Sequence, residues 1–111
     1  MKCKLNEVRV DSLIKDIDVD TFGFLNLSGR KAFYSKGVYG QGVVVAVIDS
    51  GVSPDHPELE GRVLNGKNCI KKYGNTSWKD DNKHGTHVAG TIAGKNCGIA
   101  PKAEILPVKV L

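Results

Sequence analysis

The feature that most constrains the fold of this chain is an unbroken apolar run, VVVAVI, at residues 43–48. Five of its six residues are β-branched, a side-chain type that favours strands. A strand with one solvated face alternates apolar and polar residues, whereas a continuous run is typical of a strand buried on both faces of a parallel sheet. We therefore expect an α/β fold in which this strand ends at Asp49.

The chain after this strand predicts three further elements. A short strand is expected near residues 67–70, inside a polar loop. A helix with an apolar face of small residues starts near His84 and ends around Gly94 to Gly98. Residues 103–111 form a second buried strand, although Pro107 lacks the N–H that a strand ladder uses. Together these elements predict a strand–loop–helix–strand unit with a right-handed parallel crossover.

The 111 residues are enough for one domain. Residues 1–27 are expected to be an N-terminal extension with one short strand near residues 5–10, and residues 28–111 the folded part. Ser28 as N-cap and Gly37 as stop predict a short helix at the start of that part.

Composition excludes several classes of partner. The net charge of +4 comes from scattered basic residues without interleaved aromatic side chains, so no nucleic-acid partner is expected. We also expect no membrane partner and no secretory signal, because no apolar segment is long enough for either. An odd set of cysteines without paired spacing (Cys3, Cys69 and Cys97) predicts unpaired thiols in a reducing, cytoplasmic location.

Two segments carry chemistry. Asp49 sits at the carboxyl end of a parallel strand, where sites in α/β sheets lie. Gly51 permits a sharp turn after it, and Ser50 is placed to donate a hydroxyl hydrogen bond to its carboxylate. His84 starts a helix whose positive end favours the neutral imidazole, ready to accept a proton. This pattern predicts two members of a nucleophilic triad, an orienting acid and a general base, without the nucleophile.

Three stretches of the chain carry a family resemblance. VVVAVIDSGVSPDHPEL resembles the aspartate segment of the subtilisin-like serine proteases, HGTHVAGTIAG their histidine segment, and GIAPKAEILPVKVL the strand that follows. The resemblance covers about residues 28–111, and the chain order of aspartate before histidine agrees with it. It implies the N-terminal part of a subtilisin-like parallel sheet with flanking helices. It also implies that Asp49 and His84 are catalytic.

The resemblance assigns further roles. Ser50, Gly51, Gly85 and Thr86 would support the catalytic pair, and Asn82 would line the substrate cleft. His87 matches a structural position of the family helix. The two histidines are therefore not read as a zinc pair, since Gly85 also stands where an HExxH site has its glutamate.

One metal ligand is implied. Glu58 falls where many members have an acidic calcium ligand, although the GKNCGIAP loop is shorter than the family's usual calcium loop, and a surface carboxylate is the alternative. No organic cofactor is expected. Fewer than thirty residues precede the matching region, which resembles the intracellular subtilisins, whose short extension blocks the site until it is cut.

The serine segment of the family, a GTSMA-like motif, does not occur in the 111 residues. We therefore predict a serine endopeptidase acting on protein or peptide substrates that is inactive until the remainder of the domain joins it in cis or trans. The alternatives are half of a split protease or a non-catalytic scaffold. VIDSG also fits a dimeric aspartic protease that uses Asp49, but that class gives the histidine segment no role.

Overall fold

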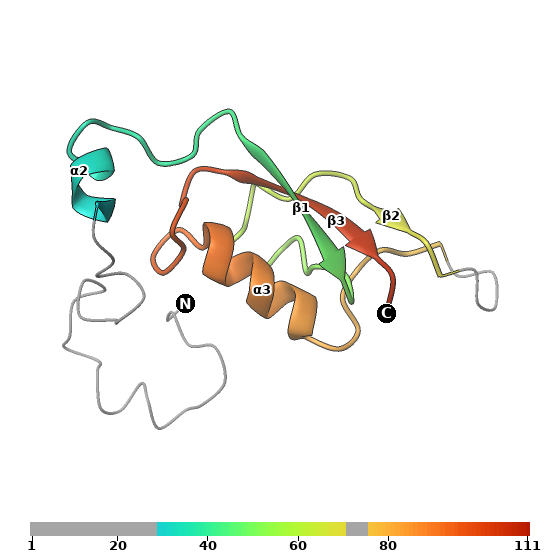
Figure 1. The fold of residues 1–111 in the computed structure, drawn as a ribbon. Coiled ribbons are helices and arrows are strands. Elements are labelled where there is room, and N and C mark those ends of the chain that lie inside the picture. The colour runs from blue at the N-terminus through green and yellow to red at the C-terminus, as the bar shows by residue number, and fades with distance from the viewer. Residues whose placement is uncertain (1–28, 71–75) are drawn as a thin grey trace, which may run out of the picture.

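The computed structural model describes residues 29–70 and 76–111 of the chain. Within them, three parallel strands form one sheet in the order β1-β3-β2 (Figure 1). The elements in chain order are α2 (Arg30–Tyr34), β1 (Val44–Asp49), β2 (Lys67–Asn68), α3 (His84–Ala93) and β3 (Glu104–Lys109). The predicted strand–loop–helix–strand unit and α/β class are confirmed.

All three strands end at one edge of the sheet. Asp49 at the end of β1 is in register with Lys109 at the end of β3, and Asn68 at the end of β2 is in register with the same lysine. Because parallel strands bring their carboxyl ends together, this edge gathers polar side chains from separate parts of the sequence.

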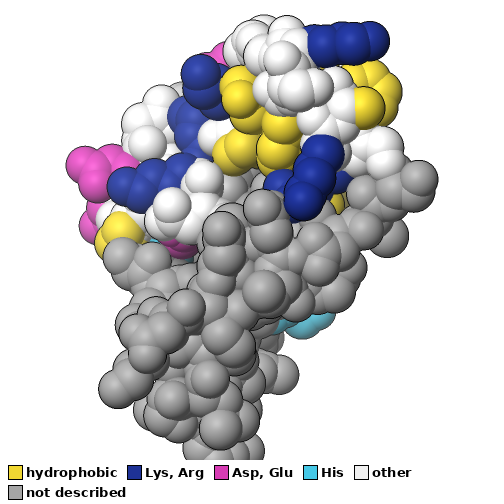
Figure 2. All heavy atoms as spheres, turned by 90° about the vertical axis from the view of Figure 1, so that its left-hand side faces the viewer, with side chains coloured by type: hydrophobic (Ala, Val, Ile, Leu, Met, Phe, Trp, Pro, Cys, Tyr) yellow, Lys and Arg dark blue, Asp and Glu magenta, His cyan; other side chains and the backbone are white. Residues whose placement is uncertain are grey.

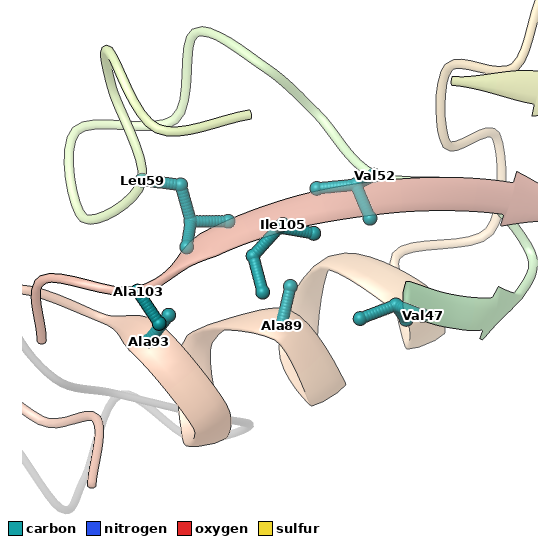
Figure 3. Close-up of a cluster of buried hydrophobic side chains, with 7 residues drawn as sticks. All are labelled: Val47, Val52, Leu59, Ala89, Ala93, Ala103 and Ile105. Atoms are coloured by element: carbon teal, nitrogen blue, oxygen red, sulfur yellow. The ribbon is translucent and has the colours of Figure 1, made fainter. Parts of the chain in front are cut away.

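Helix α3 packs on one face of the sheet, and the core lies between them (Figure 3). Ala89 and Ala93 are fully buried, and these small side chains let the helix approach the sheet closely. The buried apolar cluster consists of Val47, Val52, Leu59, Ala89, Ala93, Ala103 and Ile105.

The opposite face of β1 differs from the prediction. Val44 is 49% exposed and Ile48 is 65% exposed, so among the described residues only one face of β1 is covered. The uninterrupted apolar run therefore indicates a strand correctly, but its second face has no cover from residues 29–70 and 76–111.

Pro107 lies inside β3, which has a neighbour on each side. Glu104 N donates to Val43 O on the β1 side, and Ile105 N donates to Arg62 O on the other side. Because backbone N–H groups along a strand point alternately to its two neighbours, residue 107 faces the same side as Ile105. That position lies between the Val63–Ile105 bridge and the start of β2, so the N–H that Pro107 lacks removes no ladder bond.

The N-terminal part of the described chain is a short helical turn with an apolar surface. Helix α2 begins after Gly29, ends at Tyr34, and is followed by a left-handed Gly37 with a φ of 75°, as its role as stop predicts. Ser28 and the strand expected near residues 5–10 lie outside the described residues. At this end of the molecule, apolar side chains gather between Lys and Arg side chains (Figure 2).

Two expectations about location can be compared with the structure. Cys69 is free and exposed, but Cys97 is disulfide-bonded, so the prediction of unpaired cysteines is wrong for Cys97. In the segments that the structure describes, no helix has the length and apolar character needed to cross a membrane.

Candidate active site

The centre of the site is a pair formed by the last residue of β1 and the first residue of α3. His84 Nδ1 lies 2.8 Å from Asp49 Oδ1 and 3.0 Å from Oδ2, although the residues are 35 positions apart in the chain. The Asp49 side chain is 14% exposed and the His84 side chain 66% exposed. The aspartate is thus the inner member of the pair and the imidazole the outer one.

The surroundings of Asp49 keep it ionised. The hydrogen bond from His84 is the largest influence and lowers the pKa of the Asp49 carboxyl below its usual 3.8; burial opposes this. The backbone N–H of Ser50 donates to Asp49 Oδ1 at 2.6 Å and lowers this pKa further. An ionised carboxylate accepts the Nδ1–H bond, which leaves Nε2 of His84 as the acceptor nitrogen of the neutral ring.

A second carboxylate, Asp80, organises the start of α3. Its Oδ1 accepts hydrogen bonds from Ser50 Oγ, Asn82 N and Lys83 N, each at 2.9 Å. Its Oδ2 accepts from Thr86 N at 2.9 Å and from Thr86 Oγ1 at 2.5 Å. Asp80 therefore satisfies N–H groups that a helix start leaves without partners, and it also holds the residue after Asp49.

The hydrogen bonds of Asp80 decide its charge. Burial is the largest influence and raises its pKa, but the bonds from Thr86, Asn82 and Lys83 together outweigh it and lower the pKa to about 2. Sequence reasoning did not single out this residue. An aspartate just ahead of a predicted helix is a capping signal, and this signal could have identified Asp80 from the sequence.

Two glycines allow the end of β1 and the start of α3 to meet. A Cβ on Gly85 would lie 2.0 Å from Gly51 O, and a Cβ on Gly51, whose φ is 102°, would lie 2.4 Å from Trp78 O. Ser50 is 2% exposed. Its hydroxyl oxygen accepts a bond from Gly85 N at 2.9 Å, and the hydroxyl donates to Asp80, whereas the sequence predicted donation to Asp49. These contacts place the predicted supporting residues where they hold the pair.

The remaining predicted residues take distinct positions. Thr86 Oγ1 accepts a bond from Ser53 N at 3.0 Å, tying the loop after β1 to the helix. Asn82 is exposed, and its Oδ1 accepts from His84 N at 3.3 Å. His87 is half-buried within α3, one turn from the pair, and its structural role stays a prediction.

A cleft of about 680 Å³ opens beside the pair. Its lining includes Asp49, Ser50, Asp81, Asn82, His84 and Lys109. Sequence reasoning missed Asp81 and Lys109, which carry no motif of their own. The arrangement offers a proton acceptor, the His84 ring, beside a space large enough for an extended peptide segment and a nucleophile.

Glu58 is 2% exposed, so the alternative of a surface carboxylate is wrong. Its Oε1 accepts from Asn96 N at 3.0 Å and lies 3.3 Å from Cys97 Sγ, and its Oε2 accepts from Asn96 Nδ2 at 2.7 Å. Calcium takes six to eight oxygen ligands, whereas this carboxylate faces N–H donors. Among residues 29–70 and 76–111, no cluster of three His, Cys, Asp or Glu side chains forms a metal site. Calcium at Glu58 stays a prediction that these contacts do not support.

The fold and the pair together define a class: an α/β protein with an aspartate–histidine couple at the carboxyl edge of a parallel sheet. Residues 40–111 match the sequence profile of the Subtilase family. The chain therefore belongs to the subtilase family and represents an N-terminal part of its catalytic domain.

Similar proteins support this assignment. Subtilisin-like protease 5 of Arthroderma gypseum is 45% identical over 86 residues, which is 78% of this chain and 21% of that protein. The major intracellular serine protease of Bacillus subtilis is 44% identical over 85 residues, 70% of this chain and 27% of that protein. The solved structure of MycP3 protease from the type VII (ESX-3) secretion system has a TM-score of 0.57 and 36% identity, covering 77% of this chain and 22% of that one. The chain thus spans about a quarter of the length of such relatives.

Proposed function

We propose that this chain contributes the acid and the base of a subtilisin-type serine endopeptidase, with Asp49 orienting His84 and His84 acting as general base. The observation that carries the proposal is the bond between His84 Nδ1 and the Asp49 carboxylate, 2.8 Å to Oδ1. This bond selects the ring tautomer whose Nε2 can take a proton, and it stabilises the imidazolium once that proton has moved.

The nucleophile is the third element of the proposal. A serine hydroxyl would lose its proton to His84 Nε2 while its oxygen attacks the carbonyl carbon of a peptide bond, and His84 would then return the proton to the leaving amine. We propose that this serine comes from polypeptide outside residues 1–111, joined in cis or supplied by a second chain. The share of the relatives that the chain spans, 21% to 27%, supports this, and residues 1–111 alone are then inactive.

The substrate is proposed to be a protein or peptide that lies in the cleft beside the pair. Asn82 is exposed, lines this cleft and immediately precedes the base-bearing helix, so it is placed to contact the substrate backbone. A cytoplasmic location is proposed from the similarity to the major intracellular serine protease of Bacillus subtilis. Fractionation of the source cells tests the location, and the disulfide at Cys97 makes recovery from an oxidising compartment the contrary result.

The pair also separates the proposal from its rivals. An aspartic protease shares one proton between two carboxylates, but here Asp49 is engaged by an imidazole. A scaffold without catalysis has no need for an accessible base, and the His84 side chain is 66% exposed and lines the cleft. Both observations favour the serine mechanism.

The test compares two purified polypeptides in a fluorogenic peptide assay: residues 1–111, and the chain extended by its natural continuation or mixed with a complementing chain. We expect turnover only from the completed protein, with inhibition by a serine-directed fluorophosphonate and not by pepstatin. His84→Ala in the completed protein is expected to abolish turnover. Fluorophosphonate-sensitive turnover by residues 1–111 alone, or inhibition by pepstatin, would contradict the proposal.

A further inference from the structure

Lys109 is a buried lysine at the carboxyl edge of the sheet. It ends β3, is in register with Asp49, and is only 3% exposed. Removing an ammonium group from water is costly unless oxygen atoms replace its hydration. A buried lysine in this position therefore requires oxygen atoms as hydrogen-bond partners for its ammonium group.

Two oxygen atoms replace the water. Lys109 Nζ donates to Ser50 O at 2.6 Å and to Asp81 Oδ1 at 2.9 Å. Ser50 is the residue immediately after Asp49, and Asp81 lies three residues before His84. One side chain from β3 thus joins the backbone that carries the acid to the loop that carries the base.

The backbone of Asp49 is held by the same strand. Val110 N donates to Asp49 O at 2.8 Å, so two successive carbonyls at the end of β1, those of Asp49 and Ser50, are bonded to residues at the end of β3. The bond from Lys109 Nζ to Asp81 Oδ1 connects the same strand to the loop before His84.

We propose that Lys109 is a positioning residue for the catalytic pair, acting through Ser50 O and Asp81 to hold the His84 loop against the end of β1. The proposal rests on the proposed function for its catalytic meaning. The structural part of the proposal, that Lys109 and Asp81 stabilise the hydrogen bond between His84 and Asp49, does not depend on the proposed function.

A purely structural role predicts something different. The Lys109 side chain is 4% exposed although that of Asp81 is 74% exposed, so removing Asp81 leaves a buried ammonium with one oxygen partner fewer. If the bond mattered only for folding, removing Asp81 would speed exchange at His84 and at the core alike, through unfolding of the whole chain. If the Lys109–Asp81 bond positions the loop, removing Asp81 breaks the His84–Asp49 hydrogen bond more often while the core stays folded.

The test measures hydrogen exchange in residues 1–111 by NMR. The first signal is the His84 Nδ1 proton, and the second is the backbone amide of Ile105 in the core. In Asp81→Ala we expect the His84 proton to exchange about two- to fivefold faster, with the Ile105 amide unchanged. In Lys109→Met we expect about tenfold or more at His84, because both bonds are lost.

Two controls accompany these variants. Asp55→Ala removes an exposed carboxylate from a loop that the Lys109 bonds do not touch, and it should leave the His84 proton unchanged. Asp81→Asn keeps an oxygen acceptor for Lys109 Nζ and should restore most of the slow exchange. Both controls exclude a general effect of charge removal.

Lys109→Met is the variant most at risk of misfolding. If it does not fold, the Asp81→Ala result alone tests the proposal. An Asp81→Ala chain whose His84 proton exchanges as slowly as in the unmodified chain overturns the proposal, as does equal acceleration at His84 and Ile105. A His84 proton that exchanges in the unmodified chain as fast as in free histidine overturns it too. None of these readouts needs the nucleophile, so a negative peptidase assay and a negative exchange result are distinguishable.

Discussion

Gly85 and Gly51 touch through their backbones: a Cβ on Gly85 would lie 2.0 Å from the carbonyl oxygen of Gly51. This contact sets the distance between the strand end that carries Asp49 and the helix start that carries His84. The geometry of the pair therefore depends on residues that have no reactive group.

Gly85→Ala is expected to destabilise the chain and to open the pair. The new methyl group must displace backbone atoms, at a cost of about 1–3 kcal/mol in the free energy of unfolding. Urea denaturation measures this cost. Gly90→Ala, in the same helix, is the matched control: its Cβ would meet nothing within 4 Å, and alanine favours helix by about 0.5–1 kcal/mol over glycine. Equal losses in both variants would show that the close approach is unimportant.

Asp80 makes stability depend on acid pH. Its folded pKa of about 2 lies below its usual 3.8, so its contribution is present above pH 3.8 and is lost as the pH falls from there through about 2. The lowered pKa of Asp49 acts in the same direction. Asp80→Asn is expected to reduce, not remove, the fall in the free energy of unfolding over this range. Denaturation curves at several pH values check the slope; an unchanged slope contradicts the role of Asp80.

Asp49→Asn is expected to leave the fold intact and to remove most activity from the completed enzyme. An amide can present its NH2 group to Nδ1, which favours the wrong ring tautomer. We expect kcat to fall by about ten-thousand-fold, the loss typical of such a change. The peptide assay with Asp55→Asn as control measures it. A loss of less than tenfold would contradict the role of Asp49 as the residue that orients His84.

Glu58→Ala is expected to lower stability by about 1–3 kcal/mol, because the two hydrogen bonds that the buried Glu58 carboxylate accepts from Asn96 are lost. Glu58→Gln keeps one acceptor and should lose less. Glu60→Ala, an exposed neighbour, should stay within about 0.5 kcal/mol. Thermal melting with calcium and with EDTA belongs to the same experiment. A higher melting temperature in calcium that Glu58→Gln abolishes would establish the metal site that the contacts do not support.

Several elements and the pairing of Asp49 with His84 were predictable from local sequence. The run before Asp49, the small residues of α3 and the apolar segment of β3 each carry their own pattern, and local patterns suffice for strands and helices. The residues that flank Asp49 and those that flank His84 form sequence motifs that can be recognised without a structure. The family match agrees with that reading.

The sequence by itself determined the element order and singled out Asp49 and His84 as the proposed acid and base, because each of these features is carried by contiguous residues. Only the tertiary structure decided that one face of β1 is uncovered by the described residues, that Glu58 is buried, and that Asp80 and Lys109 connect the two catalytic segments. These features depend on atoms brought together from distant positions in the chain. Hydrogen bonding and burial act over ångströms in space, so no local pattern in the sequence reports them.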